Sequence, residues 1–117
     1  MKLRIRDDSI RLRLTRTEVD VFAAEGRVES RVRFAEKPFV YALVHDASIA
    51  HPSARFEGDA ITVHLPTSTA QAWAESDTVG IEETDGALRL LVEKDFACLK
   101  PREGEDDGDA FPHPACK

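Results

Sequence analysis

The stretch Ile5–Val28, IRDDSIRLRLTRTEVDVFAAEGRV, indicates the fold because its pattern recurs about fifty positions further along the chain. Turn, strand and helix positions of the two stretches align in these pairs: Asp8 with Asp59, Ile10 with Ile61, Leu14 with Leu65, and Phe22 with the only tryptophan, Trp73. Neither stretch is large enough to bury its apolar face alone. We therefore predict two copies of a β-β-α-β-β unit, in residues 1–46 and 54–99.

Each copy opens with the period-two alternation that is typical of two half-buried strands. Leu3 and Ile5 alternate with basic residues, and the same pattern resumes at Ile10 after Asp7-Asp8. If these aspartates form a two-residue loop, Ile5 pairs with Ile10 and the basic side chains share the opposite face. The second copy has Gly58-Asp59 at the equivalent place, which suits such a turn better.

A short helix follows each hairpin. Thr15 and Glu18 have the spacing of a capping box, and Gly26 is placed to end the first helix. In the second copy Pro66 precedes the helix, and Ser68 with Gln71 form a looser box. The apolar stripes of the two helices are Val19, Phe22 and Ala23, and then Ala70, Trp73 and Ala74.

Two further strands close each copy. The alternating strand has its apolar side chains, Val28 to Phe34 in one copy and Val79 with Ile81 in the other, on the inward face. The most apolar strands, 39–44 and 88–92, lack alternation, so we expect them to be central and covered on both sides. The predicted fold class is α+β: both units share one antiparallel sheet, curled or closed into a barrel, and two short helices cover it.

The length of 117 residues suits one domain, which we place at residues 1–99, followed by an acidic tail rich in Pro and Gly at 100–117. The tail either packs against the domain or trails from it. No apolar run approaches the roughly 18 residues of a membrane span, and the charged opening lacks the apolar region of a signal peptide. We expect a cytoplasmic protein with no membrane partner.

The net charge of −6 is unevenly spread, because nine of the sixteen basic residues fall in residues 1–33. Arg4, Arg11 and Arg13 share one face of the first hairpin, and Arg31 and Arg33 join them if their strand is a neighbour. Directly opposed cations repel, so an anion should lie among them. Acidic side chains of the second half, such as Glu82, Glu83 and Glu93, fit this place, and so does a bound phosphate or carboxylate. The acidic net charge argues against nucleic acid.

Three tail-side residues, Cys98, His113 and Cys116, could supply zinc ligands, with a fourth from His45, His51 or His64. The paired Cys-x-x-Cys spacing of a zinc site is missing, so two unrelated thiols are the alternative, and we expect no cofactor. A thiol–imidazole pair of Cys98 and His45 has no support from spacing. The chain contains no glycine-rich phosphate loop, Gly-x-Ser-x-Gly elbow or His-Glu-x-x-His helix.

Three segments together resemble a family of short uncharacterised bacterial proteins: Lys2–Thr15 (KLRIRDDSIRLRLT), Val92–Leu99 (VEKDFACL), and Glu105–Asp107 shortly before Phe111-Pro112. The resemblance covers nearly the whole chain and implies a bacterial cytosolic protein whose tail belongs to the domain. Because the family is of unknown function, the resemblance implies no catalytic residue. The alternating basic residues are also similar to those of the CYTH-type triphosphatases, whose Glu-x-Glu-x-Lys opening this chain lacks.

The first function hypothesis is a small non-catalytic binding or interaction module. Its partner is another protein or a second copy of the chain, contacted through Arg4, Arg11, Arg13 and Arg31. The alternative is an enzyme or ligand-binding protein that recognises a phosphorylated or carboxylated small molecule on the same face. Acidic side chains already lying among the arginines would favour the first hypothesis, and a bound anion would favour the second.

Overall fold

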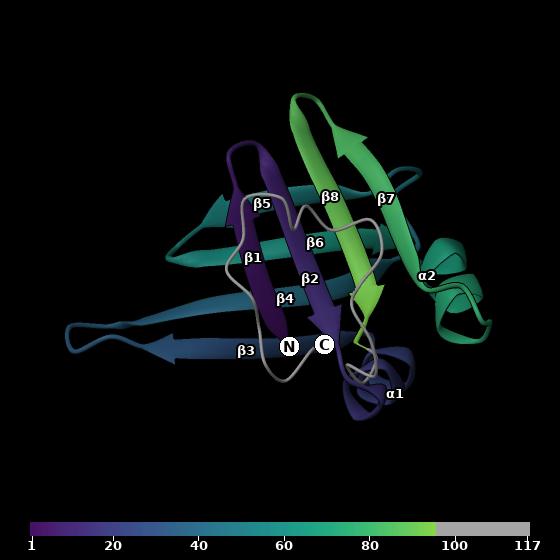
Figure 1. Ribbon diagram of the computed structural model, residues 1–117, viewed down its shortest axis with the longest axis horizontal. Helices are drawn as coiled ribbons and strands as arrows, with labels where there is room; N and C mark the ends of the chain where they lie inside the picture. Colours follow the sequence, from purple (N-terminus) through teal and green to yellow (C-terminus); the bar gives the residue numbers. More distant parts are fainter. Residues whose placement is uncertain (96–117) are drawn as a thin grey trace, which may run out of the picture.

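A computed structural model describes residues 1–95 of the chain (Figure 1). Strands and helices follow in this order: β1 (Lys2–Arg6), β2 (Ser9–Leu14), α1 (Arg16–Glu25), β3 (Arg27–Arg33), β4 (Pro38–Asp46), β5 (Ser53–Glu57), β6 (Ala60–Pro66), α2 (Thr67–Ala74), β7 (Gly80–Asp85) and β8 (Leu88–Lys94). The order β-β-α-β-β therefore occurs twice, and a connection over residues 47–52 joins the two halves.

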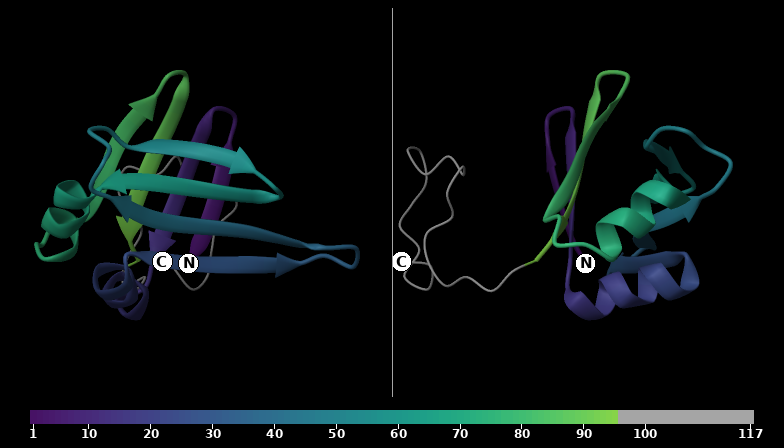
Figure 2. Two further views of the ribbon diagram at one scale, coloured as in Figure 1. Left: turned by 180° about the vertical axis from the view of Figure 1, so that it is seen from behind. Right: turned by 90° about the vertical axis from the view of Figure 1, so that its right-hand side faces the viewer.

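The strands form two four-stranded sheets, with the order β1-β2-β8-β7 in the first sheet and β3-β4-β6-β5 in the second sheet. The central pairs β2–β8 and β4–β6 are parallel, and the outer pairs are antiparallel. Figure 2 shows the sheets as two layers, and in Figure 1 their strands run in clearly different directions. The prediction of one antiparallel sheet or barrel is wrong. Alternation reports which side chains are buried, but not which hairpin becomes the neighbour.

Both helices lie together at one side of the molecule, where the chain passes from one layer to the other (Figure 1). Helix α1 contacts β2 and β3, α2 contacts β4 and β6, and the helices contact each other. The rings of Phe22 and Trp73 meet edge to face with centroids 6.2 Å apart. The helices thus close one corner between the sheets, and they do not cover a single sheet as predicted.

The predicted first hairpin is confirmed, because Ile5 pairs with Ile10 and Arg4 with Arg11 across the Asp7-Asp8 turn. The capping box is also confirmed: the Thr15 hydroxyl accepts from the Glu18 N–H, and the Glu18 carboxylate accepts from the Thr15 N–H. The looser box of the second helix is wrong. That helix begins at Thr67, so Pro66 occupies the N-cap and no side chain caps it.

The apolar interior lies between the sheets and the helix pair. Its largest fully buried side chains include Trp73, Phe22, Leu12 and Leu43. Strands β4 and β8 are central, as predicted, and consecutive residues such as Ala42 and Leu43 are buried. Because consecutive strand residues point to opposite faces, both faces are covered at these positions.

One inward residue was predicted wrongly in the second half. Val79 is 54% exposed, whereas Ile81, which was also predicted to face inward, pairs with Val92 and packs against the interior. The cause is the connection after each helix: Gly26 alone joins α1 to β3, whereas residues 75–79 join α2 to β7. The longer connection places β7 two residues later in the register than the sequence alignment predicts.

Candidate functional site

Basic side chains cover the outer face of the first hairpin. Period-two alternation places five of them on the side opposite the buried Leu12, and we call these five the basic face: Lys2, Arg4, Arg6, Arg11 and Arg13. The antiparallel register puts Arg4 directly opposite Arg11, and Lys2 directly opposite Arg13. The sequence predicted this part of the surface correctly, because a two-residue turn dictates the register.

Two carboxylates from the second half of the described chain contact the basic face. Glu93 of β8 places its Oε1 3.5 Å from the Nε atoms of both Arg11 and Arg13. Asp95 pairs with Lys2 at 3.0 Å. Arg4 and Arg6 are exposed and have no ion pair within residues 1–95. Glu93 thus partly neutralises the inner part of the face, while Arg4 and Arg6 near the sheet edge have no acidic partner among the described residues.

Arg31 and Arg33 do not join the basic face, because β3 belongs to the second sheet. On the outer face of that sheet, Arg31 and Arg27 both donate to Glu29, at 3.1 and 3.0 Å. These hydrogen bonds, Arg27 first, hold the pKa of Glu29 below its usual value. The five arginines proposed from the sequence are therefore split between two opposite surfaces, with a different acidic partner on each.

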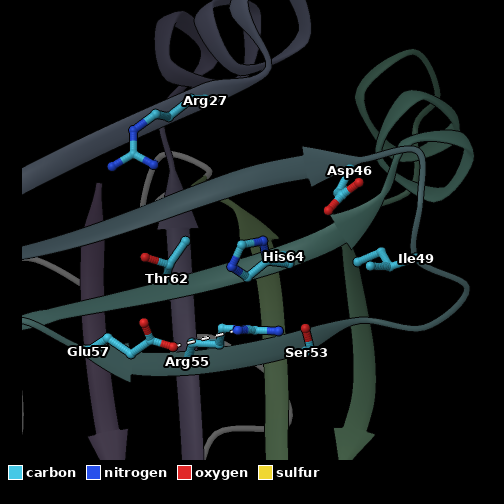
Figure 3. A pocket seen from close by; sticks show the side chains of 8 residues that line it. All are labelled: Arg27, Asp46, Ile49, Ser53, Arg55, Glu57, Thr62 and His64. Atoms are coloured by element: carbon cyan, nitrogen blue, oxygen red, sulfur yellow. Dashed lines mark ion pairs between the residues drawn. The ribbon is translucent and has the colours of Figure 1, made fainter.

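A groove of about 390 Å³ opens on the outer face of the second sheet (Figure 3). Its lining combines cations, carboxylates and hydroxyls, among them Arg27, Asp46, Arg55, Glu57, Thr62 and His64. Arg55 and Glu57 pair at 3.6 Å. Hydrogen bonds from the Ser48 hydroxyl and N–H lower the pKa of Asp46, and the nearby His64 adds to this. Sequence reasoning missed the groove, because it combines residues of the predicted second hairpin with Arg27 and Asp46, whose strands were not predicted to be its neighbours.

Large apolar side chains are exposed at the turn end of the second sheet. Val32 is 42% exposed, Phe34 61% and Phe56 74%, and Phe39 lies among them beside a groove of about 500 Å³. We call Val32, Phe34, Phe39 and Phe56 the phenylalanine patch. Their alternation places them on the same face as the buried Val28 and Ile61, so the sequence predicted core positions. The patch is exposed because β3, β4 and β5 run past the edge of the first sheet (Figure 1).

A comparison with known protein families identifies the family to which the chain belongs. The family of unknown function DUF7009 matches residues 1–115. The chain belongs to DUF7009. No curated protein matches it, and no solved structure does either. Membership accords with the sequence resemblance to an uncharacterised family, and it carries no activity with it.

In this DUF7009 protein His45 has structural neighbours. His45 lies 3.1 Å from the Thr67 hydroxyl through Nδ1 and meets the Phe22 ring edge to face. No cluster of three metal-ligating side chains occurs within residues 1–95. The proposed ligands Cys98, His113 and Cys116 lie outside the described residues, as does the thiol of the Cys98–His45 hypothesis. Across the same residues, neither helix is long and apolar enough to cross a membrane.

Proposed function

We propose that this DUF7009 protein is a small, non-catalytic interaction module that binds an acidic segment of another protein through its basic face. The observation that carries the proposal is the row Lys2, Arg4 and Arg6 on the exposed side of β1, which is an edge strand. A partner can reach cations on an edge strand both from the outer face of the sheet and from beside the strand. Arginine forks pair well with carboxylates.

The position of Glu93 supports a protein partner over a small anion. A phosphate binding on this face needs several converging guanidinium groups, but the Glu93 carboxylate already lies between Arg11 and Arg13. Arg4 still faces Arg11 across the hairpin, which is an unfavourable pairing of like charges. Carboxylates of a partner segment running along β1 would relieve it.

We also infer that the two halves of the chain arose by internal duplication, and the basic face is a feature in which they differ. Ile10 pairs with Leu90 in the first sheet and Ile61 with Tyr41 in the second, which is the register that the sequence alignment of the halves requires. The outer positions of the second hairpin instead hold a mixed set: Ser53, Arg55, Glu57, Thr62 and His64. The halves thus share buried positions, and only the first has a uniformly basic outer face.

Titration of the full-length protein with a labelled peptide of eight glutamates tests the proposal, with fluorescence anisotropy as the readout. We expect saturable binding that weakens as salt rises, because exposed charges are screened beyond roughly 10 Å at 0.1 M ionic strength. The double variant Arg4→Gln, Arg6→Gln should weaken binding by about tenfold. The matched control is Arg31→Gln, Arg33→Gln, which removes the same charge from the other sheet. Equal losses in the two double variants, or no binding, would contradict the proposal.

The groove in Figure 3 favours a second candidate function, recognition of a phosphorylated or carboxylated small molecule. Its volume falls in the range of roughly 300–1,000 Å³ that is typical of small-molecule sites. Arg27, Arg55 and Thr62 supply hydrogen-bond donors there.

Titrations with inorganic phosphate and with citrate, followed by amide NMR shifts, test this candidate. Saturable shifts centred on the groove and lost in Arg55→Gln would support it. Shifts centred on Arg11 and Arg13 would place the ligand on the basic face instead, and the absence of saturable shifts would remove the candidate.

A further inference from the structure

The free edge of β1 offers backbone groups for pairing. Arg6 and Ser9 flank the two-residue turn, so their pair is hydrogen-bonded, and hydrogen-bonded pairs alternate along an antiparallel ladder. This alternation directs the N–H and C=O groups of Leu3 and Ile5 away from β2. An edge strand of this kind is a template for a further strand.

The equivalent edge in the second half is blocked. The backbone N–H of Ala54 in β5 donates to the Asp85 carboxylate at 3.1 Å. Leu3 holds the matching place in β1, because it pairs with Leu12 as Ala54 pairs with Val63. Within residues 1–95 no side chain bonds to the backbone of Leu3 or Ile5, so the outward groups of this edge face no internal acceptor or donor there.

The phenylalanine patch lies directly beyond this edge. The Tyr41 hydroxyl donates to the carbonyl of Met1 at 2.7 Å, which places the start of β1 over Tyr41 of the second sheet. Phe39 is two residues further out along β4, roughly 7 Å, and neighbouring strands lie about 4.8 Å apart. A strand added beside β1 would therefore run over Phe39 and the rest of the patch. Ile5, 56% exposed, points into the same space.

We infer that the partner segment binds as an added strand of the first sheet, alongside β1, with acidic and apolar residues in alternation. This inference rests on the proposed function and names how the acidic segment is held. Its apolar side chains cover Ile5 and the phenylalanine patch, and its carboxylates meet Lys2, Arg4 and Arg6 on the outer face. Backbone pairing contributes affinity and the alternate pockets contribute specificity, as in other cases of β-strand addition.

Charge complementarity decides against a second copy of this chain as the occupant. Two β1 strands paired antiparallel about Arg4 would bring Arg4 opposite its own counterpart and Lys2 opposite Arg6 on the outer face. Directly opposed like charges destabilise a strand pair. Basic side chains on an edge are a common protection against pairing with identical strands, and an acidic partner escapes this protection.

Four labelled peptides test the mode of binding on the full-length protein. The first alternates glutamate and valine over seven residues, and the second has the same composition with the valines grouped together. The third and its counterpart carry N-methyl groups on alternate amides, either on the valines or on the glutamates. We expect the alternating peptide to bind about tenfold more tightly than the grouped one. One of the two methylated forms should lose binding and the other should retain it, because only one edge of the peptide faces β1.

Variants of the patch separate apolar contact from charge. Phe34→Ser with Phe56→Ser should remove the preference for the alternating peptide, while circular dichroism and thermal unfolding stay unchanged because both side chains are exposed. Val79→Ser is the matched control, since Val79 is similarly exposed but lies in the connection before β7, outside the patch. It should leave the preference intact.

Several outcomes would overturn strand addition. Equal affinity for alternating and grouped peptides, still lost in Arg4→Gln, Arg6→Gln, would overturn it and leave the proposed function standing. Equal effects of the two methylation patterns would do the same. A dimer in solution that dissociates in the Phe34→Ser, Phe56→Ser variant would show that a second copy covers the patch. Failure of every acidic peptide to bind would remove the proposed function together with this inference.

Discussion

The two halves of the chain, residues 2–46 and 53–94, bury apolar side chains at several corresponding positions but differ over much of their surfaces. Leu12 and Val63 are buried at matching places in their hairpins, and Phe22 and Trp73 meet between the helices. The last hairpins differ more. In β3–β4 the turn region carries Val32 and Phe34, whereas β7–β8 ends in Glu83, Thr84 and Asp85 before a tight turn at Gly86.

This difference shows which positions the interior constrains. A closely packed core penalises the loss of even one methylene, so matched inner positions stay apolar in both halves. The turn ends lie outside that constraint, and there one hairpin presents exposed apolar side chains while the other presents carboxylates. One of these, Asp85, bonds to the edge of β5. The two halves thus have the same order of strands and helices, but Asp85 bonds to the edge of β5, while the edge of β1 has no such bond within residues 1–95.

The largest expected effect tests whether the halves depend equally on their aromatic contact. Phe22→Ala and Trp73→Ala should each reduce the free energy of unfolding by about 3–5 kcal/mol, measured by urea denaturation, because both side chains are buried. The double variant should cost less than the sum, since the rings touch and share one cavity. Additive costs, or a cost below about 1 kcal/mol at either site, would mean that the halves do not share this contact.

A smaller effect should distinguish two glycines that have left-handed backbone angles: Gly26, which follows α1, and Gly86, in the turn between β7 and β8. Gly26 has φ +78°, and an added Cβ would lie 3.3 Å from Nε2 of His45; Gly86 has φ +62° and open space. Gly26→Ala should therefore cost about 2 kcal/mol and Gly86→Ala about 1 kcal/mol in thermal unfolding. Equal costs would show that His45 moves aside freely and that only the backbone angle matters.

The smallest expected effect concerns the helix start, where only the first half has a capping box. Burial works to raise the pKa of Glu18, but hydrogen bonds from the N-terminal amine and from Thr15 outweigh it and hold the pKa below its usual value. A depressed pKa stabilises the fold above the ordinary carboxyl pKa of 4.5 and ceases to do so as pH falls through the lower, folded value.

Glu18→Gln keeps an acceptor for the Thr15 N–H and removes only the charge. We expect it to lower the free energy of unfolding by about 0.5 kcal/mol at pH 7 and to flatten its decline below pH 5. Acetylation of the N-terminus should have a similar effect in the wild type. An unchanged pH profile in both would contradict the role of the Met1–Glu18 pair.

Much of the local structure could be predicted from particular residues. The Asp7-Asp8 turn dictates which residues pair across the first hairpin, and the Thr15–Glu18 spacing marks the start of α1. The outward position of Arg4, Arg11 and Arg13 follows from the same register. Predictions failed where the connection length changed, as at Val79, because alternation keeps its phase only while the chain stays in one strand.

The candidate surfaces were harder to predict than the elements. Arg31 and Arg33 fit an arginine face only if β3 neighbours the first hairpin, and nothing local specifies that neighbour. Phe34 and Phe56 have the inward phase of core residues, and their exposure depends on where the other sheet ends. The groove likewise forms only when β4 pairs with β6, which brings Arg27 and Asp46 to the hairpin that carries Arg55 and His64.

The amino-acid sequence by itself determined the β-β-α-β-β order, the turns, the first helix cap and the face that each hairpin buries, because these depend on contacts within a few residues. Only the tertiary structure decided that each sheet combines one hairpin from each half, with a parallel pair of strands joining the two hairpins at its centre. It also decided that β1 is an unpaired edge among the described residues and that the apolar face of the second sheet extends past the edge of the first sheet. Such pairings join residues far apart in the chain, and the same alternating pattern is compatible with more than one partner strand.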